Sequence, residues 1–147
     1  MRCRHLPIDR SEFIAAVNHA VIMPIVATGT EIVETVRIAK MLETHGEQFL
    51  ERVYTPDEIE YCVQTADAPG HFAARWAAKE AVMKALHFRR RGVRWTDIEV
   101  VVRPGVGHEI VLTGNALQCA SENEIERLHL SVSACRTHAV AHVIAES

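Results

Sequence analysis

The chain has 147 residues, 48% hydrophobic and 24% charged, and its formal net charge at pH 7 is −3. This composition predicts one soluble globular domain with a substantial core and excludes a disordered chain. The mild negative charge argues against nucleic-acid binding, so an anionic ligand would have to meet a local basic patch. The four cysteines lack paired spacing, which argues against a disulfide framework or a Cys-x-x-Cys metal knuckle and fits a reducing cytoplasm.

The most apolar stretch, FIAAVNHAVIMPIVATG, lies near the N-terminus. Asn18, His19 and Pro24 interrupt it, so it is a poor candidate for a membrane span. Asp9 and Glu12 precede it, where a signal peptide would carry positive charge. We therefore expect a protein without a membrane partner.

The first half of the chain is predicted to be mainly helical. Ser11 can N-cap a short helix that runs to about Val21. The β-branched segment IVATGTEIV predicts a strand, with Gly29 as a point where a ligand could approach the backbone. The segment ETVRIAKMLETHG has helical spacing of its apolar residues, and Gly46 is a plausible helix stop.

The next helix signal is TPDEIEYCVQ, in which Thr55 is a good N-cap and Pro56 occupies the first helical position. After the break DAPG, a second helix is expected over residues 70 to 86. Four later segments, DIEVVV, HEIVLT, LHLSVSA and HAVAHVI, are typical of strands, and GNALQCASENEI predicts a helix between them. The predicted fold class is α+β, in one domain with a strand-rich second half.

The helix that contains RWAAKEAVMKAL has no polar face. Its large apolar side chains gather on one side, and its alanines gather broadly on the other. Lys79 falls inside the large apolar stripe, while Glu80 and Lys84 lie on its border. Because buried charges persist only when they are paired or bound to a ligand or metal, these residues are candidates for a functional site.

Glu31 and Glu80 form the candidate metal pair. Two carboxylates from separate segments, together with a phosphate, suit Mg²⁺, which keeps several waters and takes few protein ligands. The alternative is structural: Glu80 pairs with Lys84 one turn later, and Glu31 is solvated.

A basic run, HFRRRGVR, follows the helix that contains RWAAKEAVMKAL. It could form, together with Lys79 and Lys84, a positive funnel for a polyphosphate. The alternative is a solvated turn, because cations are favourable at any helix C-terminus. The cationic residues of the run are His87, Arg89, Arg90, Arg91 and Arg94, next to Gly92.

Several segments together resemble the holo-acyl-carrier-protein synthases, the small group of 4'-phosphopantetheinyl transferases. They are GTEIVETVRI, FLERVYTPDEIEYC, FAARWAAKEAVMKAL, WTDIEV and AVAHVIAES, and the W-x-x-K-E-A-x-x-K-A block is the most specific. The resemblance runs from about Met23 to the C-terminus. It implies an N-terminal extension of residues 1–22 and a transferase domain of residues 23–147, compact and α+β, with a helical first half and an antiparallel-strand-rich second half.

The resemblance implies that the protein moves the phosphopantetheine arm of coenzyme A onto a serine of an apo acyl carrier protein. This Mg²⁺-dependent transferase reaction releases adenosine 3',5'-bisphosphate and needs no nucleophile from the enzyme. The family belongs to lipid metabolism, and the carrier would be of the fatty-acid or polyketide type. A homotrimer is implied, in which Glu31 and Glu80 of one chain face second-half strands of its neighbour.

The family's functional residues map onto this sequence position by position. Glu80 matches the metal-binding helix carboxylate, Glu31 stands where the family has aspartate, and Lys84 matches the lysine near the transferring phosphate. Glu80 and Lys84 are the implied catalytic residues. The coenzyme A candidates are Arg75, Lys79, Lys84, Arg89, Arg90, Arg91 and Gly92. The carrier-protein candidates, on the first helix of the domain, are Arg37 and Lys40.

The sequence departs from the family pattern at three places. Glu31 is one methylene longer than the family aspartate, HFRRRG replaces a glycine-rich turn, and Ala134 stands where many members carry a polar side chain, often histidine. These departures leave open the alternative of a diverged, non-catalytic homologue that binds carrier protein or coenzyme A.

Overall fold

The computed structural model describes residues 24–87 and 92–147. The predicted helix that begins at Ser11 and the arginines at positions 89 to 91 lie outside the described residues. Within the described part, no helix is long and apolar enough to cross a membrane. The elements are β1 (Ile25–Glu34), α2 (Thr35–Val53), α3 (Pro56–Val63), α4 (Ala68–Ala85), η2 (Trp95–Asp97), β2 (Ile98–Arg103), β3 (Gly107–Leu112), α5 (Gly114–Glu122), β4 (Arg127–Ala134) and β5 (His138–Glu146).

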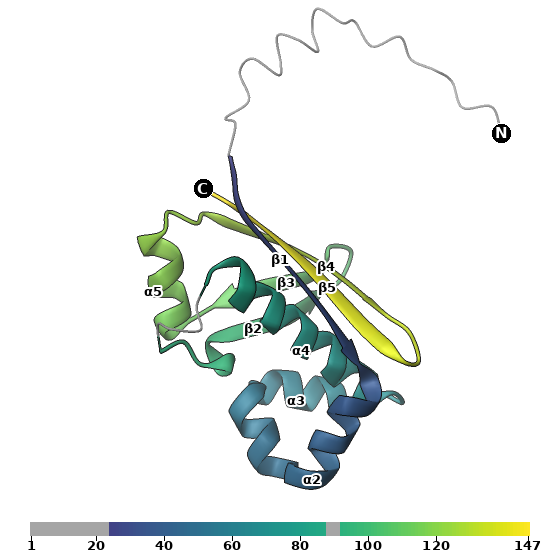
Figure 1. Cartoon of the computed structure of the whole chain (residues 1–147). Coiled ribbons are helices and arrows are strands. Elements are labelled where there is room, and N and C mark those ends of the chain that lie inside the picture. Colours follow the sequence, from purple (N-terminus) through teal and green to yellow (C-terminus); the bar gives the residue numbers. More distant parts are fainter. Residues whose placement is uncertain (1–23, 88–91) are drawn as a thin grey trace, which may run out of the picture.

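The strands form two antiparallel units. One is a three-stranded sheet in the order β1-β5-β4, and the other is the hairpin of β2 and β3. Helix α4 packs against β1 and β5 and also contacts α2, α3 and β2, so it occupies the centre of the molecule (Figure 1). Every strand and helix predicted for residues 24–87 and 92–147 is present, which confirms the α+β class.

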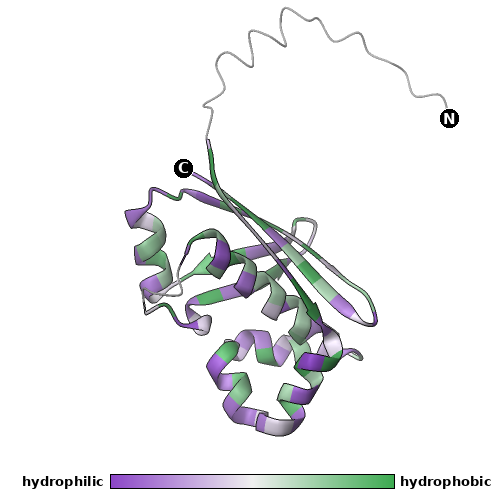
Figure 2. Cartoon of the chain, viewed as in Figure 1, coloured by the Kyte–Doolittle hydropathy of each residue, from purple (hydrophilic) through white to green (hydrophobic). Residues whose placement is uncertain are grey.

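The alanine side of α4 allows unusually close packing against strand β1. A Cβ atom on Gly29 would lie 2.0 Å from the Ala81 carbonyl oxygen and 2.8 Å from the Ala85 nitrogen. Gly29 is therefore required for contact between strand and helix, and the expectation that it admits a ligand is wrong. Figure 2 shows the largely hydrophobic colouring of α4 at this contact.

The sequence suggested that the helix stops at Gly46. In the structure Gly46 interrupts helix α2, and a second helical segment follows it. Gly46 adopts φ 50° and ψ −128°, and helical structure resumes after it and continues to Val53. Glycine tolerates this positive φ at little cost, so the chain kinks instead of ending the helix. The kink lets Phe49 and Val53, both buried, reach the core.

Helix α3 begins as predicted. The Thr55 hydroxyl accepts a hydrogen bond from the Glu58 backbone N–H (3.3 Å), and a Glu58 carboxylate oxygen accepts one from the Thr55 N–H (2.9 Å). This reciprocal capping box fixes the start of the helix. The other Glu58 oxygen accepts a hydrogen bond from the Val100 backbone N–H (2.9 Å), which joins α3 to strand β2.

Candidate functional site

Strand β1 brings Glu31 to helix α4. A Glu31 carboxylate oxygen lies 2.8 Å from the Lys84 Nζ, and the two side chains are 20% and 45% exposed. The same Nζ donates to the Thr30 carbonyl at 3.1 Å. Glu31 is therefore paired and not simply solvated, and Lys84 keeps enough exposure for its ammonium group to reach a ligand.

Glu80 lies one helical turn before Lys84, on the same face of α4. It is 7% exposed and, with Met83, Val93 and Trp95, lines a cavity of about 320 Å³. Since Lys84 contacts Glu31, the two carboxylates and the ammonium group share one region. Glu31 and Lys84 are thus in contact, and Glu80 lies one turn away on the same helix.

The donor set at this region fits Mg²⁺. Mg²⁺ prefers oxygen ligands and is commonly held by one or two carboxylates, with waters and substrate phosphates completing the coordination. Among residues 24–87 and 92–147 no group of three or more His, Cys, Asp or Glu side chains is arranged to hold a metal. Glu31 and Glu80 would therefore supply a shared site and not a complete protein cage.

Lys79 does not face this region. It is fully buried, and its Nζ contacts the Glu58 carboxylate (2.6 Å), the Val53 carbonyl (2.8 Å) and the Trp95 carbonyl (3.1 Å). An ammonium group has three N–H donors, so all of them have protein acceptors. This geometry assigns Lys79 to the core, against the expectation that it binds coenzyme A.

Burial lowers the pKa of Lys79, while the Glu58 carboxylate opposes the shift. A buried charge of this kind is tolerated because its partner and the two carbonyls replace its hydration. The positive funnel predicted from Lys79, Lys84 and the arginine run therefore loses one of its members.

Arg75 also points away from Lys84. The two residues are nine positions apart on α4, which places them about 180° apart around the helix axis. The Arg75 guanidinium lies over the Tyr61 ring, 4.3 Å from its centroid, and donates to the His71 carbonyl. Its buried Nε has no hydrogen-bond partner within the described part of the chain. One coenzyme molecule cannot readily contact both cations of the same chain.

The Arg75 guanidinium acts on the titratable groups around it. His108 on strand β3 is half-buried, and burial, followed by the charges of Arg75 and His71, lowers its pKa. Burial also raises the pKa of the nearby Cys62 thiol to about 11, although Arg75 opposes this shift. Arg75 itself is only 2% exposed, so within one chain it is not open to a coenzyme molecule bound at Lys84.

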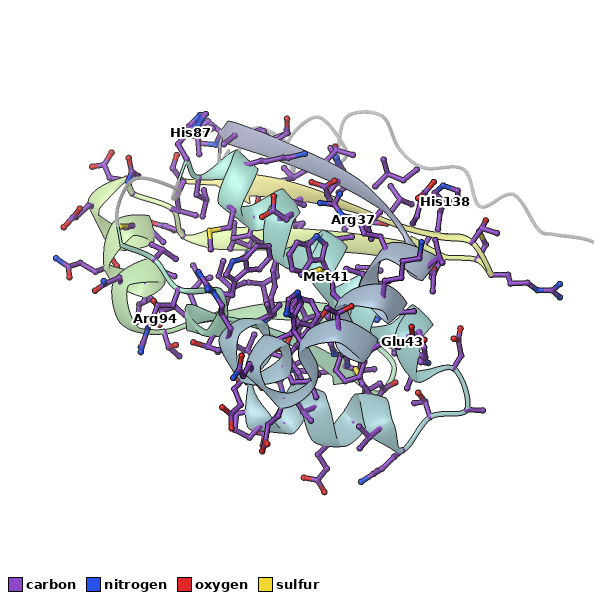
Figure 3. The ribbon with its side chains drawn as sticks, turned by 60° about the horizontal axis from the view of Figure 1, so that its bottom comes forward. Arg37, Met41, Glu43, His87, Arg94 and His138 are labelled. Atoms are coloured by element: carbon purple, nitrogen blue, oxygen red, sulfur yellow. The ribbon has the colours of Figure 1, made fainter. Side chains whose placement is uncertain are left out.

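Helix α2 presents the predicted carrier-binding residues. Arg37 and Lys40 are exposed on its first segment (Figure 3). Beside them lies an open pocket of about 290 Å³, which sequence reasoning missed because distant segments form it. The pocket is lined by Met41, His45, Gln48, Phe49, Arg52, Val53, Trp76 and Trp95.

The remaining predicted residues fall as follows. Gly92 adopts φ +69°, a conformation that favours glycine, and its carbonyl accepts a hydrogen bond from the Asn115 amide (3.1 Å). Ala134 ends strand β4, exposed and paired with Ala139. Arg89, Arg90 and Arg91 lie outside the described residues.

The fold and site together define a small α+β domain in which a strand carboxylate pairs with a lysine of the central helix, one turn from a second carboxylate that lines a pocket. Residues 27–142 match the family model of the 4'-phosphopantetheinyl transferase superfamily. The chain is 57% identical over 122 residues to a holo-[acyl-carrier-protein] synthase of Rhodopirellula baltica, covering 83% of this chain and 98% of that protein. The chain therefore belongs to the 4'-phosphopantetheinyl transferase superfamily.

Two solved structures extend the likeness. The crystal structure of holo-[acyl-carrier-protein] synthase from Neisseria meningitidis matches with a TM-score of 0.77 and 31% identity, over 84% of this chain and 100% of that one. The Helicobacter pylori holo-[acyl-carrier-protein] synthase, solved in complex with coenzyme A, matches with a TM-score of 0.70 and 29% identity, over 80% and 98%.

Proposed function

We propose that the protein is a holo-[acyl-carrier-protein] synthase. It transfers the 4'-phosphopantetheine arm of coenzyme A to a serine of an apo acyl carrier protein and releases adenosine 3',5'-bisphosphate. The observation that carries the proposal is the contact of Glu31 with Lys84 on α4, one turn from Glu80, which lines a pocket. Membership of the superfamily supports it.

In the proposed reaction, the serine oxygen of the carrier forms a bond to the phosphorus that bears the pantetheine arm. The bond from that phosphorus to the oxygen bridging the diphosphate breaks, and the serine proton passes to water or to the released 5'-phosphate. Glu31 and Glu80 hold Mg²⁺, which when bound supplies positive charge to the diphosphate. Lys84 donates a hydrogen bond to the transferring phosphate, and this positioning with charge stabilisation replaces covalent catalysis.

The segment after α4 completes the coenzyme site in this proposal. Arg89, Arg90 and Arg91 neutralise phosphate charge, and Gly92 lets the backbone turn close to the ligand. Long cations replace the fixed N–H groups of a glycine-rich turn. Binding of coenzyme A should therefore depend strongly on salt.

The carrier protein docks on helix α2. Arg37 and Lys40 attract an acidic surface, and the apolar pocket beside Met41 takes an apolar side chain of the carrier (Figure 3). This surface lies next to Trp76 and Trp95, and Trp95 also lines the cavity of Glu80. A carrier bound here has its serine directed toward that cavity. We place this reaction in the cytoplasm, in fatty-acid biosynthesis.

The functional unit in this proposal is a homotrimer with its sites at the subunit interfaces. Arg75 of one chain supplies positive charge to the site formed by Glu31, Glu80 and Lys84 of the next. This arrangement accounts for the positions of Lys84 and Arg75 on opposite sides of one helix. Light scattering at micromolar concentration tests it: a fully active monomer would exclude the shared site.

The test of the activity is direct. Purified protein is incubated with coenzyme A, Mg²⁺ and an apo acyl carrier protein, and the carrier is weighed by mass spectrometry. Addition of a phosphopantetheine arm to the serine is expected, and chelation of Mg²⁺ should prevent it. Binding of coenzyme A or carrier without any addition would instead support the non-catalytic alternative.

A further inference from the structure

The chain segment that forms one wall of the open cavity beside Glu80 is held from inside the core. Lys79 donates to the Trp95 carbonyl (3.1 Å), and the Trp95 side chain lines the cavity. The Trp95 ring also stacks on Trp76, with 4.3 Å between ring centroids. The position of Trp95 is therefore set by helix α4 through both a backbone contact and a ring contact.

Two further sets of contacts order the same segment, which we call the cavity wall (residues 92–97): one from α5 and one within the segment itself. Asn115 donates to the Gly92 carbonyl (3.1 Å). Asp97, which is buried, accepts a hydrogen bond from the Arg94 backbone N–H (3.0 Å) and pairs with the Arg94 guanidinium. The anchor from Lys79 differs from these two because it comes from the residue adjacent to Glu80.

The adjacency of Lys79 and Glu80 links the wall to the carboxylate. Successive helical residues point about 100° apart, so Lys79 reaches into the core while Glu80 faces the cavity. Glu58 fixes the Lys79 side chain through a contact of 2.6 Å and is itself fixed by the N–H groups of Thr55 and Val100. The distance between Glu80 and the wall is thus set by a rigid buried network.

The cavity offers apolar surface next to a charged group. Met83, Val93 and Trp95 line, together with Glu80, an open volume of about 320 Å³. The pantetheine arm begins, next to its phosphate, with a carbon that bears two methyl groups. Such a group gains from apolar contact, whereas adenosine 3',5'-bisphosphate has no such part.

We propose that Lys79, held by Glu58, is a positioning residue that keeps the cavity wall at the right distance from Glu80 to accept the methyl-bearing start of the pantetheine arm. The inference rests on the proposed function and adds to it a subsite and the residue that shapes the subsite. Lys79 touches no substrate. Its effect reaches the coenzyme through Trp95 and Val93.

The test uses the double variant Lys79→Met/Glu58→Gln, because removing Lys79 alone would leave a buried carboxylate unpaired and destabilise the fold. The KM for coenzyme A should rise about tenfold, since a small displacement of a binding wall is costly. The affinity for adenosine 3',5'-bisphosphate should stay within about twofold of the parent. Tyr54→Phe, which removes a buried hydrogen bond to the Phe72 carbonyl, is the matched control for loss of core stability.

Trp95→Ala provides a second route that leaves the ion pair intact. Trp95→Ala should raise the KM for coenzyme A by a similar factor and leave the affinity for adenosine 3',5'-bisphosphate unchanged. If the double variant does not fold, Trp95→Ala alone tests the proposed subsite. Unchanged KM for coenzyme A in folded variants would overturn the positioning role. Equal weakening of coenzyme A and bisphosphate would overturn the assignment of the cavity to the arm. Failure of the parent protein to transfer the arm would instead refute the proposed function.

Discussion

Replacing Glu80 by Gln tests the carboxylate at the centre of the site. The side chain is 7% exposed and lines the cavity, and glutamine has nearly its shape, so packing should be retained. Only the negative charge and one acceptor oxygen are lost. If that charge holds Mg²⁺ and orders the diphosphate, the rate should fall about 100-fold to 1,000-fold, comparable to removing one electrostatic group from an active site. The free energy of unfolding should change by less than about 1 kcal/mol.

The assay follows carrier modification by mass spectrometry over a range of Mg²⁺ concentrations, with thermal melting in parallel. Glu60→Gln, a change of the same chemistry on the exposed face of α3, is the control and should behave like the parent. If Glu80→Gln transferred the arm at the parental rate, the site assignment would be refuted. A lower melting temperature with full activity would show instead that the carboxylate serves the core.

Three further changes probe packing, charge and pH. Gly29→Ala places a Cβ 2.0 Å from the Ala81 carbonyl oxygen and should cost about 3 kcal/mol, seen as a clearly lowered melting temperature. Replacing Arg37 and Lys40 by Glu should raise the KM for the carrier about tenfold at low salt, and the increase should be smaller at high salt. The KM for coenzyme A should not change. Because the pKa of His108 is lowered in the fold, the unfolded chain binds a proton there more readily as pH falls through about 6.5, and stability is lost. His108→Gln should therefore lose less stability than the parent between pH 7 and 5, measured by chemical denaturation.

The sequence was most informative where a signal is local. The capping box of Thr55 and Glu58 depends on residues three positions apart, and the alternation of the strands needs only the chain itself. The absence of a polar face on α4 correctly indicated that its charges have unusual partners. The ion pair of Lys84 with Glu31 requires a strand and a helix to meet, and it was not predicted: the structural alternative paired Lys84 with Glu80 and left Glu31 solvated.

The contact partners of Lys79 could not be predicted from the local sequence. Helical spacing placed it in the large apolar stripe, but spacing does not say what the stripe packs against. In the fold that stripe meets α3 and β2, where Glu58 has already been oriented by Thr55 and Val100. Gly46 is a similar case: its conformation suits a helix stop, and the burial of Phe49 makes the helix resume. Tertiary contacts therefore determine both the partners of Lys79 and the course of the helix after Gly46.

Complementation between two inactive variants tests the shared site most stringently. Arg75 lies on the face of α4 opposite Lys84, so in the proposed trimer Glu80 of one chain works with the partner subunit's Arg75. Arg75→Gln and Glu80→Gln should each give an inactive homotrimer. After the two are unfolded together and refolded as a 1:1 mixture, a site is intact when its Glu80 comes from an Arg75→Gln chain and its Arg75 from a Glu80→Gln chain. Random assembly makes this happen in about one quarter of the sites, which sets the expected activity relative to the parent. Mixed trimers seen by native mass spectrometry without recovered activity would show that both residues serve a site within one chain.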